Sequence, residues 1–245
     1  MKIANEQGEN LDVLVIDTAN SKKTIIFVHG LGTDKNEGHN LFGVIASALK
    51  EEFRLILFDL SGCGKSEGKE EDSNLLKQSK DLETIINYVH AKYGEDTYII
   101  AHSFGTFVTA RLSPDNIQKI IFVAMANKDT SGNSIKDRIR SRGGTVDEKG
   151  TSLYPRTSGG IQKIGSSFWL ELARFDPIAE VRKLASKTSL TIIEPNQDEI
   201  VKRENREGYD EIQNLHYIRL DGSHDFADPE QRKTLIQHIS SILTA

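Results

Sequence analysis

Residues 98–110, YIIAHSFGTFVTA, decide how this chain folds. The first three are aromatic or β-branched, which is typical of a short buried strand. Over residues 104–112 the apolar side chains recur at helical spacing, and this stretch contains no proline and one glycine. Almost no residues remain between strand and helix, so the chain must turn from one into the other in a single step.

The residue at this turn is Ser103, which must adopt a strained backbone conformation. Small residues two positions to either side, Ala101 and Gly105, let the strand and the helix approach each other. The pattern is the nucleophile elbow G-x-S-x-G with alanine in place of the first glycine. We interpret Ser103 as a nucleophile in front of a helix N-terminus, which stabilises developing negative charge. The simpler alternative is a serine that caps an ordinary helix.

Strands and helices alternate along most of the chain. The predicted strands cover residues 2–6, 10–16, 24–28, 54–59, 98–100, 117–124, 190–194 and 216–220. The predicted helices cover residues 40–52, a long segment that ends at residue 93, 104–112, 168–174, 177–186 and 229–243. The first two strands are expected to form a hairpin, and the rest of the pattern predicts an α/β fold. Its central sheet is mostly parallel and is flanked by helices.

Composition limits the classes of protein to consider. A chain of 245 residues is long enough for a single α/β domain, residues 1–245. Its net charge of −5 and pI near 5.8 argue against nucleic acid as a partner. The single cysteine cannot form an internal disulfide, and residues 1–6 lack the apolar core of a signal peptide. No apolar run reaches the ~20 residues that span a bilayer. We expect a cytoplasmic monomer or homodimer.

The loop after the strand at residues 24–28 is the second candidate part of a site. It begins His29-Gly30-Leu31, and a glycine-flanked loop at a strand end turns backbone N–H groups toward a ligand. The H-G-x pattern supplies half of an oxyanion hole, here the N–H of Leu31, and the N–H of Phe104 supplies the other half. A plain glycine-rich turn is the alternative. We expect His29, Gly30 and His102 to contact the substrate.

The loop at residues 59–66, DLSGCGKS, comes close to a phosphate-binding loop. That motif, G-x-x-x-x-G-K-[ST], requires glycine where Asp59 stands, and a carboxylate there repels phosphate. We therefore interpret the segment as a tight loop near the site rather than as a nucleotide-binding loop.

The alternation of strands and helices fails after residue 126. Residues 127–165 are rich in Gly, Ser, Thr and charge without a sustained apolar period, so regular structure is expected to return only at residue 168. Residues 128–163 contain eight Lys or Arg against four Asp or Glu, a local charge of +4. One interpretation is a solvated insertion. The other is a cap over residues 127–176, in which Tyr154, Phe168 and Trp169 line a substrate pocket.

Two further residues complete a possible catalytic set with Ser103. Asp198 and His224 each follow a predicted strand, at the sheet edge where ligands collect in open α/β folds. The chain order Ser, Asp, His distinguishes α/β-hydrolases from two unrelated protease arrangements. Other carboxylates compete for the role of the acid: Glu194, Glu199 and Asp225.

With these residues placed, the whole chain resembles the serine hydrolases of the α/β-hydrolase fold. Three stretches are similar to the feruloyl and cinnamoyl esterase group: HGLGTDKNEGHNLF, DLSGCGKSEG and FWLELARFDP. The resemblance implies Ser103 as nucleophile, Asp198 as acid, His224 as base, the amides of Leu31 and Phe104 as oxyanion hole, and a small cap. The chain departs from that group at Ala101, at Phe104, and at Glu194-Pro195, where His-Gly is common.

The expected activity is hydrolysis of a small to medium acyl or aryl carboxylic ester through an acyl-enzyme, with hydroxycinnamoyl esters among the candidates. No metal or organic cofactor is implied. The same residues also serve a peptidase, a thioesterase or an acyltransferase. A non-catalytic ligand-binding protein of the same fold is the alternative from another class.

Overall fold

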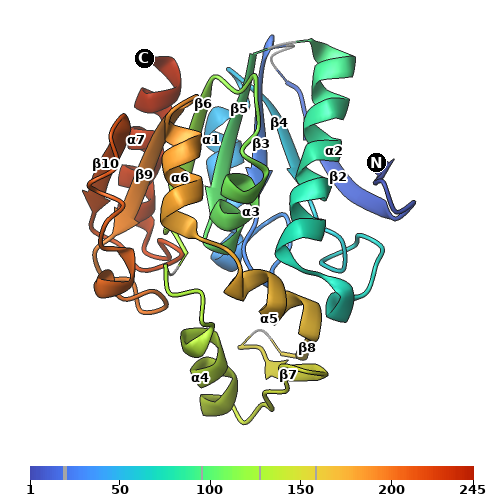
Figure 1. Ribbon diagram of the computed structural model, residues 1–245. Coiled ribbons are helices and arrows are strands. Elements are labelled where there is room, and N and C mark those ends of the chain that lie inside the picture. The colour runs from blue at the N-terminus through green and yellow to red at the C-terminus, as the bar shows by residue number, and fades with distance from the viewer. Residues whose placement is uncertain (19–20, 95, 127, 158) are drawn as a thin grey trace.

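The computed structural model describes residues 1–18, 21–94, 96–126, 128–157 and 159–245. Asn127, the residue from which the predicted cap was counted, lies outside these ranges. Within them, eight strands form one sheet in the order β1-β2-β4-β3-β5-β6-β9-β10 (Figure 1). Their bounds are β1 Lys2–Ala4, β2 Asn10–Ile16, β3 Lys23–Val28, β4 Arg54–Phe58, β5 Asp96–His102, β6 Lys119–Val123, β9 Ser189–Pro195 and β10 Leu215–Leu220.

The sheet is parallel from β4 to β10, whereas β2 pairs antiparallel both with β4 and with β1. The predicted mostly parallel α/β fold is therefore confirmed. Strands β3, β5 and β6 consist almost entirely of buried residues because helices cover both of their faces.

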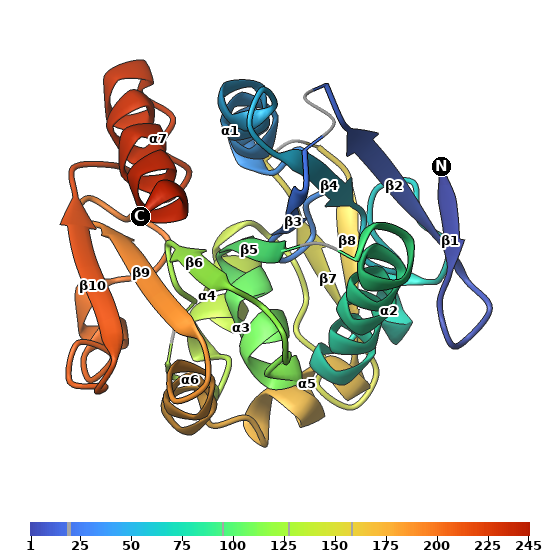
Figure 2. The ribbon, with the colours of Figure 1, turned by 90° about the horizontal axis from the view of Figure 1, so that it is seen from above.

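Helices cover the two faces of the sheet in two groups, as the view from above shows (Figure 2). Their bounds are α1 Leu41–Leu49, α2 Leu75–Tyr93, α3 Phe104–Leu112, α6 Pro177–Ala185 and α7 Pro229–Thr244. Helices α2, α3 and α6 pack into one hydrophobic cluster, and α1 and α7 pack into the cluster on the opposite face. Short 3₁₀ turns occupy Gly38–Asn40, Glu70–Asp72 and Arg203–Arg206.

The helix ends follow the expected chemistry. Asn74 accepts a hydrogen bond from the Lys77 amide at the start of α2, and Gly94 ends that helix with a φ of 56°. Asp176 caps α6 in the same way, directly before Pro177 at the first helical position. No helix in the described part of the chain is both long and apolar enough to cross a membrane.

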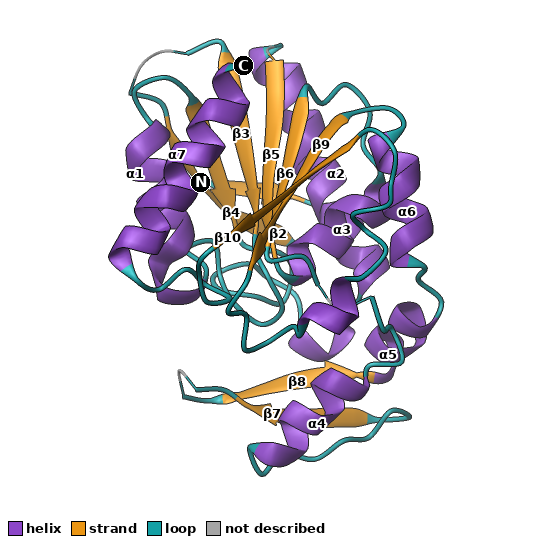
Figure 3. Ribbon diagram, turned by 90° about the vertical axis from the view of Figure 1, so that its left-hand side faces the viewer, coloured by secondary structure: helices purple, strands orange, loops and turns teal. Residues whose placement is uncertain are grey.

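Residues 128–176, here called the inserted segment, contain regular structure that the sequence did not predict, except for the helix predicted at residues 168–174, which is present. They contain α4 Asn133–Ser141, the hairpin β7 Thr151–Pro155 and β8 Ile161–Gly165, and α5 Ser166–Ala173. In β7, buried and exposed residues alternate over only five positions, which is too short a pattern to stand out in a glycine-rich stretch. Figure 3 shows the hairpin and α4 below the loops that follow the parallel strands.

Candidate active site

The turn between β5 and α3 has the strained geometry that its sequence predicted. Ser103 alone separates the strand from the helix, with a φ of 51° and a ψ of −123°. A Cβ atom added to Gly105 would lie 2.3 Å from the Val28 carbonyl oxygen, so glycine is required there. Ala101 is fully buried opposite Val28, where its single methyl group is accommodated. The elbow thus tolerates alanine at its first small position but not at its second.

Ser103, His224 and Asp198 form a chain of hydrogen bonds. The His224 Nε2 atom lies 3.0 Å from the Ser103 Oγ atom, and its Nδ1 atom lies 2.8 Å from Asp198 Oδ2. Because an ionised carboxylate only accepts hydrogen bonds, Nδ1 carries the proton of the neutral ring, and Nε2 is left to accept the serine proton. The three residues come from loops after β5, β9 and β10.

Asp198 is held as an ionised carboxylate. Its Oδ1 atom accepts hydrogen bonds from the amides of Ile200 and Val201, each at 2.8 Å, and its Oδ2 atom contacts the guanidinium of Arg206. Burial by itself raises the pKa of this carboxyl group. The hydrogen bond to His224, the charge of Arg206 and the Val201 amide lower the pKa by more than burial raises it, so the net shift is downward. Arg206 is only 2% exposed, and nothing in its local sequence marked it.

In the structure, the competing carboxylates contact groups other than the His224 ring. Glu199 accepts a hydrogen bond from the backbone amide of His224 at 3.2 Å, not from its ring. Glu194 lies 3.7 Å from Arg206 and also contacts a tyrosine hydroxyl. Asp225 faces the ring of His102 at 3.8 Å. Among these acids, Asp198 has the geometry to orient the His224 ring.

The two amides expected to bind an oxyanion belong to the two segments next to Ser103. Phe104 is the first residue of α3, and Leu31 lies in the loop that follows β3. Among the described residues, neither amide donates a hydrogen bond to a protein acceptor. The loop passes close over the serine, since a Cβ atom on Gly30 would lie 3.1 Å from the Ser103 Cβ atom.

A buried ion pair beneath this loop was not anticipated from the sequence. Glu37, with a φ of 62°, points its carboxylate inward, where it accepts a hydrogen bond from the Gly30 amide and lies 3.3 Å from His102 Nδ1. The His102 Nε2 atom lies 3.0 Å from the His224 carbonyl oxygen. The Nε2 atom therefore has a hydrogen-bond acceptor, whereas Nδ1 lies within ion-pair distance of the Glu37 carboxylate without forming a hydrogen bond. The nearby carboxylate favours the doubly protonated imidazolium.

The charges of this pair agree with that geometry. Burial lowers the pKa of His102, but the carboxylate of Glu37 outweighs burial and raises it to about 9. For Glu37 the signs are reversed: burial raises the pKa of its carboxyl group, and His102 and the Gly30 amide lower that pKa to about 2. A charged pair thus joins the loop after β3 to the residue before the nucleophile. The only sequence signal was a glutamate seven residues after Gly30.

The residues expected to contact substrate are distributed unevenly. Gly30, Leu31, His102, Ser103 and His224 line one cavity of about 850 Å³. This volume lies within the range of small-molecule binding sites.

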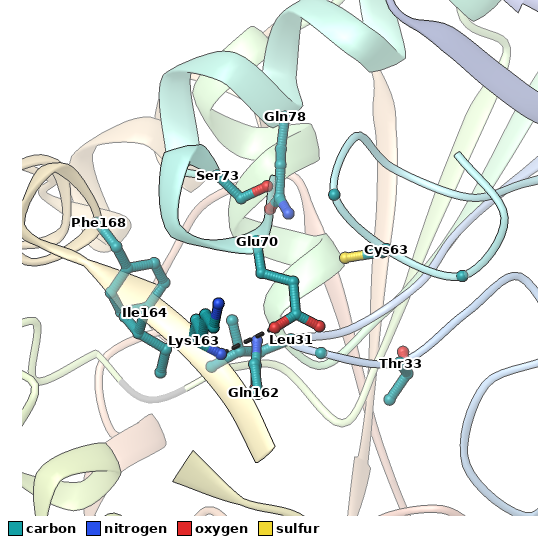
Figure 4. A pocket seen from close by; sticks show the side chains of 13 residues that line it. Leu31, Thr33, Cys63, Glu70, Ser73, Gln78, Gln162, Lys163, Ile164 and Phe168 are labelled. Atoms are coloured by element: carbon teal, nitrogen blue, oxygen red, sulfur yellow. Dashed lines mark hydrogen bonds between the residues drawn. The ribbon is translucent and has the colours of Figure 1, made fainter. Parts of the chain in front are cut away.

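The remaining three candidates lie outside that cavity's lining. His29 is fully buried, with Nε2 accepting the Leu60 amide at 3.0 Å, so it shapes the loop. Phe168 lines a smaller, adjoining cavity of about 60 Å³, shown in Figure 4, beside Leu31 and Cys63. Trp169 is 5% exposed and donates a hydrogen bond to Ser152 at 3.2 Å. These contacts favour packing roles for His29 and Trp169.

Known proteins resemble this chain in family pattern and in structure. A family model described as alpha/beta hydrolase fold matches residues 23–141. The structure of Est1E from Butyrivibrio proteoclasticus with bound ferulic acid is similar over 100% of this chain and 98% of its own, with a TM-score of 0.79 and 19% identity. An esterase from Pyrococcus furiosus is similar over 100% and 90%, with a TM-score of 0.70 and 21% identity. A putative hydrolase from Agrobacterium vitis is similar over 98% and 96%, with a TM-score of 0.72 and 16% identity.

Proposed function

We propose that this chain, which has the α/β-hydrolase fold and resembles feruloyl esterases, hydrolyses carboxylic esters with Ser103 as its nucleophile. The observation that carries the proposal is the chain of hydrogen bonds from Ser103 Oγ through His224 to Asp198, at 3.0 and 2.8 Å. Ser103 lies at a strained elbow, and Ser103 and His224 line a cavity of about 850 Å³. The esterase-like fold supports a hydrolase function, while the ester specificity and the residue roles are the proposal.

In the first half of the reaction, His224 Nε2 removes the Ser103 proton as the hydroxyl oxygen attacks the ester carbonyl carbon. Asp198 holds the ring in the required tautomer and stabilises the imidazolium that forms. The negative charge that develops on the carbonyl oxygen is stabilised by the amides of Leu31 and Phe104 and by the N-terminus of α3. His224 then donates its proton to the leaving alcohol, and an acyl-serine remains.

In the second half, His224 removes a proton from water, which attacks the acyl carbon and releases the acid. The Glu37–His102 pair supports both halves by positioning. Its carboxylate fixes the Gly30 amide, one residue before the proposed oxyanion donor Leu31, and its imidazolium contacts the His224 carbonyl oxygen.

The inserted segment is proposed to act as the cap of a single domain. Its residues Arg138, Arg142, Tyr154 and Arg156 line the cavity that Ser103 and His224 also line. It is attached to the domain at several points, including hydrogen bonds from Lys163 to Glu70 and from Arg156 to the Leu31 carbonyl oxygen. A cap so placed selects substrates without supplying the reacting groups.

A fluorophosphonate probe and a panel of aryl and alkyl esters of graded acyl length test the proposal. We expect the wild type to be labelled at Ser103 and to hydrolyse esters, and the Ser103→Ala variant to do neither while keeping its fold. Labelling with turnover of only peptides or thioesters would replace the ester assignment with another acyl-transfer reaction. No labelling of the folded wild type would favour a binding protein and would refute a nucleophilic serine.

A further inference from the structure

Three arginines of the inserted segment line the same cavity as the proposed nucleophile. Arg138 lies on α4, Arg142 follows that helix directly, and Arg156 follows β7. Ser103 and His224 belong to the lining of this cavity as well. The positive charge of the inserted segment is therefore directed in part at the site where the ester would bind.

The arginines in the cavity differ in their pairing from the basic residues around them. On α4, Lys136 pairs with Glu148 at 2.8 Å, and Arg140, on the exposed side, pairs with Asp137 at 3.1 Å. Among the described residues, no carboxylate forms an ion pair with Arg138, Arg142 or Arg156, and the buried Nε atom of Arg138 has no hydrogen-bond partner. A buried donor without an acceptor is costly unless a ligand supplies one.

The protein holds two of these guanidinium groups in place without neutralising them. The buried ring of Tyr154 contacts both, with its centroid 5.4 Å from Arg142 and 4.9 Å from Arg156. Arg156 also donates hydrogen bonds to Gln162 at 3.1 Å and to the Leu31 carbonyl oxygen at 3.0 Å. These neutral contacts orient the guanidinium group and leave its charge available.

Among the described acids that line the cavity, Glu37 and Asp225 face a positive charge already, and Asp34 accepts a backbone hydrogen bond. Glu37 is paired with His102, and Asp225 faces the same ring at 3.8 Å. Asp34 accepts a hydrogen bond from the Asn36 amide at 2.8 Å. Burial and the neighbouring guanidinium groups lower the pKa of Arg138, although a guanidinium stays protonated in proteins. An anion entering the cavity would relieve the repulsion between the guanidinium groups of Arg138, Arg142 and Arg156.

We propose that the substrate of Ser103 carries an anionic group, a carboxylate or a phosphate, which Arg138, Arg142 and Arg156 bind. Planar guanidinium groups match the paired oxygens of both anions. The inference rests on the proposed ester hydrolysis and adds the class of ester. The anion can be part of the acyl group or of the alcohol, and the test covers both.

The first experiment compares matched esters on the wild type. Mono-4-nitrophenyl adipate is paired with 4-nitrophenyl hexanoate, in which a methyl group replaces the carboxylate, and 4-acetoxybenzoate is paired with its methyl ester. After correction for spontaneous hydrolysis, we expect kcat/KM to favour the anionic member of at least one pair by about tenfold or more. This preference should shrink as ionic strength rises from about 0.02 M to about 0.5 M.

The second experiment measures the same anionic-to-neutral ratio in Arg138→Met, with Arg140→Met as the control from the same helix. The ratio should fall about 10- to 100-fold in Arg138→Met, because charge-assisted hydrogen bonds are lost, and should stay unchanged in the control. An equal fall in both variants would refute the role of the cavity arginine. The wild-type comparison remains decisive if Arg138→Met does not fold.

Inhibition identifies the anion. Hexylphosphonate, heptanoate and neutral heptanamide are compared as inhibitors of 4-nitrophenyl hexanoate hydrolysis. Stronger inhibition by the phosphonate assigns a phosphate, and stronger inhibition by heptanoate assigns a carboxylate. If neither anion exceeds the amide, or if neither ester pair favours its anionic member, the inference fails while ester hydrolysis stands. No turnover of any of the four esters would instead refute the proposed function.

Discussion

The buried pair of Glu37 and His102 yields the sharpest prediction. Glu37→Gln keeps the size of the side chain and removes its charge, so it leaves the imidazolium of His102 with only the more distant carboxylate of Asp225, 3.8 Å away. Both side chains are almost completely inaccessible to water, at 2% and 1% exposure. Solvent therefore screens the interaction little, and its loss should appear in the free energy of unfolding.

The magnitude follows from the pKa of His102. A rise from 6.5 to about 9 corresponds to about 3 kcal/mol of stability, which agrees with the cost of breaking buried ion pairs. Because the pKa is raised in the folded state, this stability is fully present below pH 6.5 and is lost as the pH rises through about 9. The pKa of Glu37 is lowered from 4.5 to about 2, so its contribution is present above pH 4.5 and is lost as the pH falls through about 2. The two shifts report largely the same interaction and are not added.

The assay is urea unfolding of the wild type and of Glu37→Gln at about pH 6 and about pH 9.5. We expect the variant to be less stable by about 3 kcal/mol at the lower pH and by much less at the higher pH, with an unchanged denaturant dependence. Asp137→Asn, which removes the exposed partner of Arg140, is the control and should change stability by less than about 0.5 kcal/mol at either pH. An equal loss at both pH values, or a loss below about 1 kcal/mol at pH 6, would refute the charged pair.

Three further predictions concern the proposed mechanism and the cap. Ser103→Ala and His224→Ala should each lower kcat by about 10⁵- to 10⁶-fold with circular dichroism unchanged, and a variant that keeps a tenth of the activity would contradict the mechanism. Asp198→Asn should lower kcat by about 10⁴-fold and Asp225→Asn far less, so the reverse ranking in the same ester assay would refute the choice of acid. Trp169→Ala should lower the free energy of unfolding, measured with heat and urea, by about 3–5 kcal/mol, because it removes a buried indole and its hydrogen bond to Ser152 of the β7–β8 hairpin. Unchanged stability with an altered ranking of esters would instead make Trp169 a substrate contact.

The features that the sequence predicted are those set by neighbouring residues. The elbow depends on a short buried strand, a helix and two small residues within a few positions of Ser103, and the structure has this geometry. The central strands appeared as continuous apolar runs because helices cover both faces of a parallel sheet. The end of α2 at residue 93 was predicted, and there the amide of the left-handed Gly94 donates a hydrogen bond to the carbonyl oxygen of His90, four residues earlier. Hydrogen bonds of this kind span few residues and leave a local pattern.

The charged groups around the site were decided only by the tertiary structure. Arg206 reaches Asp198 because the segment after β9 folds back, and Glu37 meets His102 across more than sixty residues of chain. Residues 128–163 of the inserted segment likewise showed a net charge of +4 in the sequence, but not which of their arginines would be paired with acids and which would face the cavity. Phe168 and Trp169, both aromatic and adjacent, were equally plausible substrate contacts until folding placed them outside the lining of the main cavity. Local spacing therefore determined the elbow and the sheet. Pairing between charges, and the side of a helix or hairpin that faces a cavity, depend on how loops fold back and on how distant segments pack, which residue spacing does not encode.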